Sequence, residues 1–270
     1  MHFKSIWATA VRNYQIQLRA YPKDFFIGNV LTCFFLVLGT FFIYKTMFNA
    51  KVSHDFAHYA GTGDYMSFVI LGSIIYMFVV RTFLNVSRSF ITEMREGTLD
   101  SLLVAPVSHM GYLCGNMLEQ TITTTGEAAV ALLICLPFGL NLTSINLLST
   151  LICMLASLFA FFSMSIILGA FMLYSRDTYI CQNTVFALLN LICGTMFPVQ
   201  YLPGWVQNIS YSIPVTYSLK ILRNSVLNGM DIASQLQDFS MLLVLSVFYG
   251  AIGVLLIRKV IKTAPENQFM

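Results

Sequence analysis

Residues 128–175 read AAVALLICLPFGLNLTSINLLSTLICMLASLFAFFSMSIILGAFMLYS, which is 48 residues without a Lys, Arg, Asp or Glu. A transmembrane helix needs about 20 apolar residues to cross the hydrocarbon of a bilayer, so this run is too long for one crossing. Pro137, Gly139 and Asn141 interrupt it early, and such residues end helices. We therefore predict that one membrane span ends before this break and that another covers residues 146–174.

The whole chain has the same apolar character. Hydrophobic residues make up 57% of its 270 residues and charged residues 10%, against about 25% charged residues in an ordinary soluble domain. This composition excludes a soluble globular enzyme and a disordered chain. The net charge of +3 is too small for a nucleic-acid-binding surface. We predict an all-α polytopic membrane protein that has no nucleic-acid partner.

Charged residues are costly in lipid, so the gaps between them mark the spans. Six spans are predicted, at residues 25–44, 65–88, 111–137, 146–174, 178–197 and 239–257. The second is the least regular, because its uncharged run before Arg81 has 16 residues and is about 24 Å long as a helix. It crosses if Arg81 extends to the membrane interface, or if the helix continues through Asn85 in contact with protein.

The positive charges predict the orientation of these spans. With six spans, both termini lie on one side, which collects eleven of the fifteen Lys and Arg residues. Basic residues are enriched in cytoplasmic loops. We therefore expect a multi-pass protein of the cell membrane, taken to be a bacterial plasma membrane, with both termini in the cytoplasm.

Residues 1–24 precede the first span and have a different pattern. Apolar side chains fall near one helical face, while Lys4, Arg12 and Arg19 fall elsewhere. Trp7 and Tyr14 suit the headgroup layer, which favours an amphipathic helix at the membrane interface. An ordinary soluble amphipathic helix is the alternative. A cleavable signal is not expected, because the apolar run starts late and no A-x-A site follows it.

A short helix is predicted within residues 92–108, TEMREGTLDSLLVAPVS, on the cytoplasmic side after the second span. Gly97 ends the preceding helix, Thr98 is a suitable N-cap and Pro106 ends the new helix. Asp100 lies in its first turn, where a negative charge suits the helix dipole.

This short helix has an apolar stripe formed by Leu99, Leu102 and Leu103. Two turns of helix cannot bury such a stripe alone, so it either rests at the membrane interface or docks into a groove on a partner. The flanking charged residues can pair with charges on that partner. They are Glu93, Arg95 and Glu96. The alternative is a solvated loop with a helix cap.

Two ordered motifs resemble the type-two permease subunits of ATP-binding-cassette exporters. The first is Arg95-Glu96-Gly97-Thr98-Leu99-Asp100-Ser101-Leu102-Leu103, followed by Pro106 and Gly115. The second is Gly194, Phe197-Pro198, Leu202-Pro203, Trp205, Pro214, Thr216-Tyr217, Arg223 and Gly229. Met94, Asp100 and Asn116 depart mildly from the family pattern, and these departures concern contact detail with the partner. The resemblance covers essentially the whole chain.

The resemblance implies that residues 97–105 form the coupling helix, which fits a groove on an ATP-binding subunit. The N-terminal amphipathic helix is then the connecting helix. Residues 198–229, with Pro198, Pro203, Trp205, Pro214 and Arg223, become a helical hairpin that re-enters the membrane from outside. Three prolines and a Trp in an outer segment with few charges also favour protein burial; a hydrophobic loop lying on the headgroups is the alternative.

The resemblance also implies partners. A second permease subunit, identical or closely related, pairs with this one, and the ATP-binding subunit holds ATP and Mg. This chain has no G-x-x-x-x-G-K-[ST] phosphate loop, so we expect no enzymatic activity, catalytic residue, metal site or cofactor on it. Membrane lipid surrounds the pair.

Two carboxylates fall within the third predicted span. Intramembrane carboxylates usually face a bundle interior or a polar cavity. For Glu127, a residue lining a translocation path and a structural residue at a helix interface both remain open; for Glu119 the structural role is favoured. The candidate path, partly implied by the resemblance, comprises Phe68, Tyr76, Phe78, Glu127, Asn183, Asn190 and Thr195.

The predicted function is therefore a permease subunit of an ATP-driven exporter. Its expected substrate is amphipathic, such as a lipid, a drug or a hydrophobic peptide, moved out of the cytoplasm or the inner leaflet. The alternative is an ion-driven carrier or channel without an ATPase partner, using Glu119 and Glu127. A membrane-bound lipid enzyme is a third class, which no His/Asp constellation supports.

Overall fold

The computed structural model describes residues 2–20, 24–47, 54–104, 108–142, 144–175 and 179–263, and this part of the chain contains helices and connections but no strand. The α-helices are α1 (His2–Ala20), α2 (Asp24–Met47), α3 (His54–Ala60), α4 (Tyr65–Phe78), α5 (Ser89–Arg95), α6 (Leu99–Val104), α7 (His109–Cys135), α8 (Leu147–Ser175), α9 (Tyr179–Ile192), α10 (Gly204–Tyr211), α11 (Pro214–Leu227) and α12 (Leu236–Thr263). A π-helix, η1 (Val79–Asn85), continues α4, and short 3-10 helices are η2 (Leu136–Phe138), η3 (Val199–Tyr201) and η4 (Ile232–Gln235).

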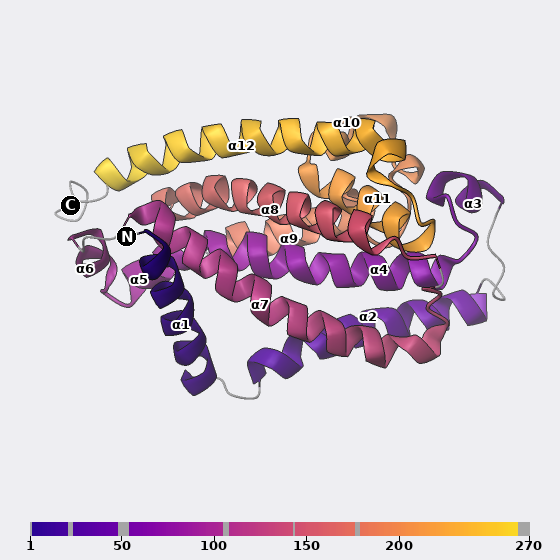
Figure 1. Cartoon of the computed structure of the whole chain (residues 1–270), viewed down its shortest axis with the longest axis horizontal. Helices are drawn as coiled ribbons and strands as arrows, with labels where there is room; N and C mark the ends of the chain where they lie inside the picture. Colours follow the sequence, from indigo (N-terminus) through magenta and orange to yellow (C-terminus); the bar gives the residue numbers. More distant parts are fainter. Residues whose placement is uncertain are drawn as a thin grey trace.

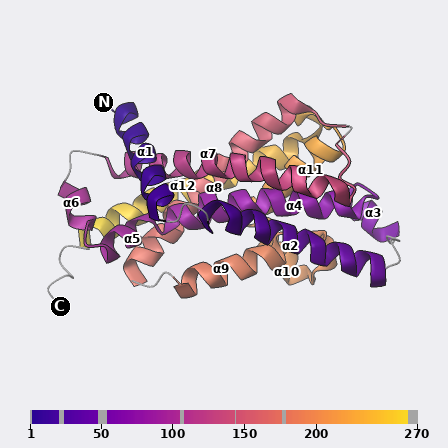
Figure 2. The ribbon, with the colours of Figure 1, turned by 90° about the horizontal axis from the view of Figure 1, so that it is seen from below.

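The long helices α2, α4, α7, α8 and α12 run along the longest axis of the molecule, whereas α1 crosses their direction (Figures 1 and 2). One end of the bundle carries α1, α5, α6 and the last turns of α12; we call it the α6 end. The opposite end carries α3 and the loops beside α10 and α11, and we call it the α3 end.

Four stretches of the described chain are long and apolar enough to cross a membrane: Tyr65–Asn85, His109–Phe138, Leu147–Ser175 and Ile232–Val260. They correspond to the second, third, fourth and sixth predicted spans. The other two predicted spans contain shorter apolar helices, Val30–Thr46 and Asn183–Ile192. The predicted all-helical membrane fold is therefore confirmed, while the count of six spans is not.

The fifth predicted span ends earlier than residue 197. Helix α9 stops at Ile192, because the chain turns at Gly194, whose φ is +79°. The second predicted span agrees more closely, since helical residues continue past η1 through residue 87 and a turn follows at residue 88. It follows the second of the two expected routes: Arg81 is 3% exposed inside the protein and does not extend to an interface.

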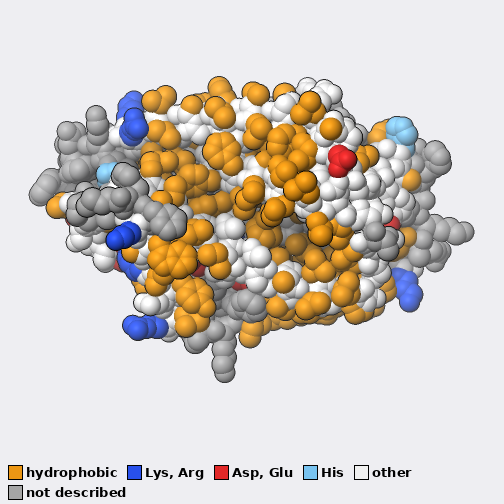
Figure 3. Space-filling model, in the orientation of Figure 1, with side chains coloured by type: hydrophobic (Ala, Val, Ile, Leu, Met, Phe, Trp, Pro, Cys, Tyr) orange, Lys and Arg blue, Asp and Glu red, His pale blue; other side chains and the backbone are white. Residues whose placement is uncertain are grey.

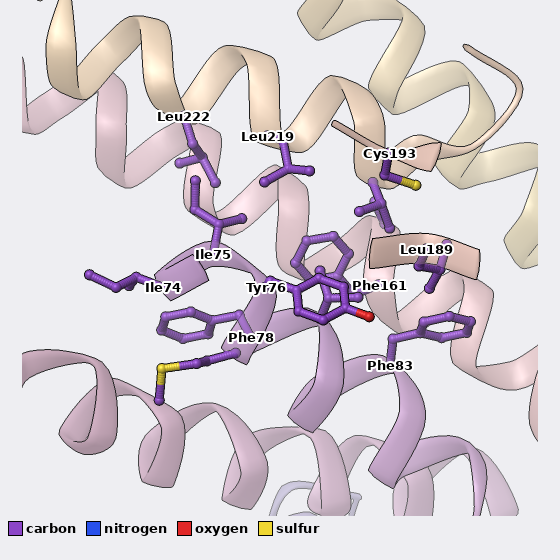
Figure 4. Packing of buried hydrophobic residues seen from close by; sticks show 14 of the residues in the cluster. Ile74, Ile75, Tyr76, Phe78, Phe83, Phe161, Leu189, Cys193, Leu219 and Leu222 are labelled. Atoms are coloured by element: carbon purple, nitrogen blue, oxygen red, sulfur yellow. The ribbon is translucent and has the colours of Figure 1, made fainter. Parts of the chain in front are cut away.

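The core is built around the α4–η1 helix, which is almost wholly buried within the chain, whereas α12 exposes most of its apolar surface. Leu219 and Leu222 of α11 project toward Ile75 of α4 (Figure 4). On the outside, hydrophobic side chains cover most of the middle of the molecule, and the visible basic side chains lie toward its two ends (Figure 3). Because lipid favours this distribution, the exposed apolar middle fits a membrane environment.

Helix α1 packs against the first half of α7 through a glycine. A Cβ atom on Gly115 would lie 2.6 Å from Cβ of Thr9 and 2.8 Å from the backbone oxygen of Ile6. Both distances are too short for real atoms, and a backbone oxygen cannot rotate away. Gly115 therefore permits the close crossing of these two helices.

We expect Gly115→Ala to lower the free energy of unfolding by about 1–3 kcal/mol through overpacking. Gly39→Ala on α2 is the matched control, because no atom lies within 4 Å of the added Cβ and its helix gains the same propensity. Thermal unfolding of both variants in the same detergent measures the difference. Equal stability of the two variants would contradict the close α1–α7 packing.

Candidate functional site

The connection between α5 and α6 forms the tip of the α6 end. Gly97 has a φ of +72°, in the left-handed region that favours glycine. The turn is closed by the amide of Thr98, which donates to the backbone oxygen of Glu93 at 2.9 Å. Helix α6 follows at once, as the sequence predicted. Pro106 and the side chain of Leu103 lie outside the described residues.

The apolar stripe of α6 packs onto its own chain. Leu99 is 3% exposed and lies in a cluster with Phe90, Tyr112 and Leu113, and Leu102 packs against the same cluster. The stripe had been expected to meet a membrane interface or a partner's groove. The inward packing instead fixes how α6 is oriented on α5 and α7.

The opposite side of this segment is charged and exposed. Arg95, Glu96, Gly97, Thr98 and Asp100 are all exposed. Val104, at the end of α6, is 87% exposed. These six residues form one outward surface at the α6 end, and we call it the α5–α6 surface.

Glu93 lies behind this surface, and within this chain it does not face outward. It is 5% exposed. One carboxylate oxygen accepts from Arg12 of α1 at 2.8 Å and from the Tyr112 hydroxyl of α7 at 2.9 Å. The other accepts from the Thr98 hydroxyl. Glu93 therefore ties α1, α7 and the start of α6 to α5.

A second carboxylate, Glu127 of α7, is paired with Arg81 of η1 in the middle of the bundle. Nε and Nη2 of Arg81 donate to the two carboxylate oxygens, with an Nε–Oε2 distance of 3.3 Å. Their side chains are 4% and 0% exposed. A two-point contact of this kind is the strong form of an Arg–carboxylate pair. Glu127 is thus held inside the chain, facing η1.

Polar contacts continue from this pair toward the α6 end. Asn85 of η1 donates to Gln120 of α7 at 3.3 Å, and Gln120 donates to Glu119 at 2.6 Å. Thr123 donates to the other oxygen of Glu119 at 3.2 Å. These bonds give Glu119 partners within the helix pair. Among the described residues, no three His, Cys, Asp or Glu side chains lie together in a way that could hold a metal ion.

The aromatic residues of the candidate path point into the core. Phe68, Tyr76 and Phe78 are all buried. The Tyr76 hydroxyl donates to the backbone oxygen of Phe186 on α9 at 2.6 Å, so α4 and α9 are joined at this point. The aromatic residues and Glu127 lie around α4 and η1, within the chain.

The polar residues of the candidate path lie along and just beyond α9. Asn183 is exposed. Asn190 is half-buried, and its Oδ1 has no hydrogen-bond partner. Thr195 is 0% exposed, and its hydroxyl has no partner. Thr195 lies near one of the aromatic residues, because Arg223 donates to its backbone oxygen and packs over the Phe68 ring.

Residues 198–229 form a hairpin of α10 and α11 at the α3 end. Pro198 and Pro214 are buried, while Pro203 is exposed and precedes α10. Trp205 is 70% exposed, and Arg223 is 6% exposed. Helix α11 packs against α4, α8 and α12, so the second half of this hairpin is part of the core, whereas α10 leaves Trp205 and Ile209 exposed.

The residues that sequence reasoning missed are the partners of the buried carboxylates. Arg12, Tyr112 and Arg81 received no role as candidate site residues, although each contacts a carboxylate that did. One signal was available for Arg81. An Arg inside one apolar run and a Glu inside the next favour pairing, because buried charges in membranes are paired.

Similarity to known proteins agrees with this architecture. Residues 6–227 match the family model described as ABC-2 type transporter. The chain is 23% identical over 265 residues to the inner membrane transport permease YadH of Escherichia coli K12, covering 95% of this chain and 94% of YadH.

Two longer proteins match in part. Over 201 residues the chain is 23% identical to "Probable multidrug ABC transporter permease YbhR" of Escherichia coli K12, covering 73% of this chain and 53% of YbhR, so it spans about half of that relative. Over 177 residues it is 28% identical to ABC transporter G family member 20 of Dictyostelium discoideum, covering 64% of this chain and 24% of that protein. With the family model matching most of its length, the chain belongs to the ABC-2 type transporter family of membrane transport permeases.

Proposed function

We propose that this chain is the transmembrane permease subunit of an ATP-driven exporter, and that the α5–α6 surface binds a separate ATP-binding subunit. The observation that carries the proposal is the arrangement around Glu93. An exposed charged surface is held rigidly, through one buried carboxylate, to the two helices that lie behind it. Such a surface can transmit a push from a partner into the membrane helices.

The proposed topology has six spans, in which α2 and α9 are added to the four long apolar stretches. Both termini lie in the cytoplasm and the α3 end lies outside. This is supported by the position of α1, α6 and the last turns of α12 at the same end of the bundle (Figure 1). The excess of basic residues on that side also supports it. The α10–α11 hairpin then enters the membrane from the outside.

The proposed mechanism assigns no chemical step to this chain. The ATP-binding subunit binds ATP and Mg and moves α6 when it closes. Through Glu93, that movement reaches α1 and α7, and through α5 it reaches η1. A second permease copy or a close relative completes the complex, and its contact with this chain changes as the helices shift.

The proposed substrate is amphipathic, such as a lipid, a drug or a hydrophobic peptide. The printed name of the YbhR relative refers to multidrug transport, which favours this class. Phe68, Tyr76, Phe78 and Glu127 are buried in the single chain, so a path along them requires α4 and η1 to separate from their neighbours. Asn183, Asn190 and Thr195 complete the proposed path.

The test is charge reversal on the α5–α6 surface. We expect Glu96→Arg to reduce the amount of ATP-binding subunit that co-purifies with the tagged chain at least about tenfold, because like charges would then face each other. Mg-dependent ATP hydrolysis in the same eluate should fall in parallel. Thermal unfolding of the isolated chain should stay unchanged, because Glu96 is exposed.

Lys45→Glu is the matched control, since it reverses an exposed charge on α2 at the other end of the bundle. It should leave co-purification intact. Normal assembly and transport in Glu96→Arg would contradict the proposed docking surface. An ion-driven carrier, the competing function, would continue to export an amphipathic dye from cells that lack any ATP-binding partner.

A further inference from the structure

A cavity of about 220 Å³ lies at the α3 end, between the end of α3, the connection from α9 to α10, and α11. It is smaller than the roughly 300–1,000 Å³ of pockets that hold drug-sized ligands. Its lining joins a few cationic and amide side chains with aromatic rings. The size suits a small group more than a whole amphipathic substrate.

Arg223 of α11 is the innermost charged residue of this cavity. It is 6% exposed. Nη1 donates to the backbone oxygen of Gly194 at 2.7 Å, and Nη2 donates to that of Thr195. Its Cζ lies 3.6 Å from the centre of the Phe68 ring. Nε is buried and has no hydrogen-bond partner, so one donor of the guanidinium remains unused.

Gly72 of α4 fixes the guanidinium in this place. A Cβ atom at residue 72 would lie 2.0 Å from Nη2 of Arg223 and 2.2 Å from the backbone oxygen of Thr195. The helix therefore needs a glycine where the guanidinium passes. The side chain is held in position before any ligand arrives, which lowers the cost of binding one.

The cavity carries positive charge that the described part of the chain does not neutralise. The ion pairs in the described part of the chain are Arg12–Glu93, Arg81–Glu127 and Lys220–Asp238. None of them involves Arg223. Burying a charge without an opposite charge is costly. Two carbonyl dipoles and an aromatic face reduce that cost but supply no negative charge, so the site favours an anion.

Further donors surround the same space. Lys220 is exposed at the rim, where its ion pair with Asp238 measures 2.7 Å. The amide side chains of Gln200 and Asn224 also line the cavity. These groups come from η3 and from α11, so donors from two elements can reach one anion, and phosphate oxygens are strong acceptors for such donors.

We propose that this cavity binds a phosphate group, supplied either by inorganic phosphate or by the headgroup of an anionic phospholipid. The proposal concerns the opposite end of the bundle from the α5–α6 surface and does not depend on the proposed function. A bound phosphate joins α11 to the α9–α10 connection at the α3 end of the bundle.

The experiment uses the full chain, purified in a maltoside detergent that contains no phosphate. Two probes are titrated separately, inorganic phosphate and dioctanoylphosphatidylglycerol, and thermal unfolding reports binding. We expect at least one probe to stabilise the wild-type chain. Binding of phosphate alone identifies the free ion as the source, and binding of the short-chain lipid alone identifies the headgroup.

Arg223→Gln should weaken this binding at least about tenfold, because it removes the buried positive charge. Since a buried variant can fail to fold, Lys220→Gln and Asn224→Leu test the rim of the cavity, and each should weaken binding several-fold. Lys45→Gln, an exposed lysine outside the cavity, is the matched control and should bind as the wild type does. No stabilisation by either probe, or equal stabilisation of the rim variants and the control, would overturn the proposal.

Discussion

Glu127→Leu is expected to lower the free energy of unfolding by about 3–5 kcal/mol, the largest stability loss that we predict for a single side chain. The substitution leaves Arg81 buried, with its side chain 4% exposed and its carboxylate partner gone. A guanidinium stays charged at any physiological pH, so the variant cannot remove the buried charge by releasing a proton. The variant therefore carries the full free-energy cost of a buried, unpaired charge.

Removing the arginine of this pair instead should cost less stability. Arg81→Met leaves Glu127 without its partner, but a carboxyl group can bind a proton and become neutral in an apolar site. The double variant Arg81→Met/Glu127→Leu removes both charges and should regain most of the lost stability, because apolar residues of similar volume often replace a buried ion pair at little cost. From most to least stable, we therefore expect the double variant, then Arg81→Met, then Glu127→Leu.

Thermal and denaturant unfolding in one detergent measures this order. Asp238→Asn is the control, since it breaks an ion pair whose lysine is 53% exposed and should cost less than about 1 kcal/mol. A loss of the same size in Glu127→Leu and Asp238→Asn would contradict a buried pair. So would a double variant that is less stable than both single ones.

The predicted spans show how far the sequence specifies this fold. Uncharged runs and the breaks at Pro137 and Gly139 located the long helices to within a few residues, because charge is excluded from lipid whatever the tertiary structure. The pairing of Arg81 with Glu127 could not be predicted in the same way. It depends on the rotation of the α4–η1 helix relative to α7, and the π-helical turn that sets this rotation leaves no pattern in the residues.

The candidate site was predictable at the level of the segment and less so at the level of single residues. Gly97 and the start of α6 follow from local turn chemistry. The direction of each side chain does not, because it depends on helices far away in sequence. Leu99 and Glu93 had been expected to face a partner, and α7 and α1 bury them instead. The residues that remain exposed include Arg95, Glu96 and Asp100. They are fewer than the residues of the sequence motif.

Because Glu93 is buried behind the exposed residues, we predict a second large effect, on transport, when it is substituted. We expect Glu93→Gln to leave assembly with the ATP-binding subunit intact while reducing transport per ATP hydrolysed by roughly tenfold, which lies within the range of about 5- to 150-fold typical of coupling between two sites. The amide keeps the shape of the side chain but loses the charge that attracts Arg12. The α5–α6 surface then stays in place while its connection to α1 weakens.

Efflux of an amphipathic dye and ATP hydrolysis, measured on the same membranes, give this ratio. Tyr112→Phe and Arg12→Gln each remove one donor to Glu93 and should produce smaller losses of the same kind. Glu96→Arg should instead co-purify with at least about tenfold less of the ATP-binding subunit. If Glu93→Gln also loses that subunit, Glu93 must contact the partner directly. If its transport ratio is unchanged, the motion reaches the membrane helices through α5 alone, and the contact with α1 serves only to hold that helix on the bundle.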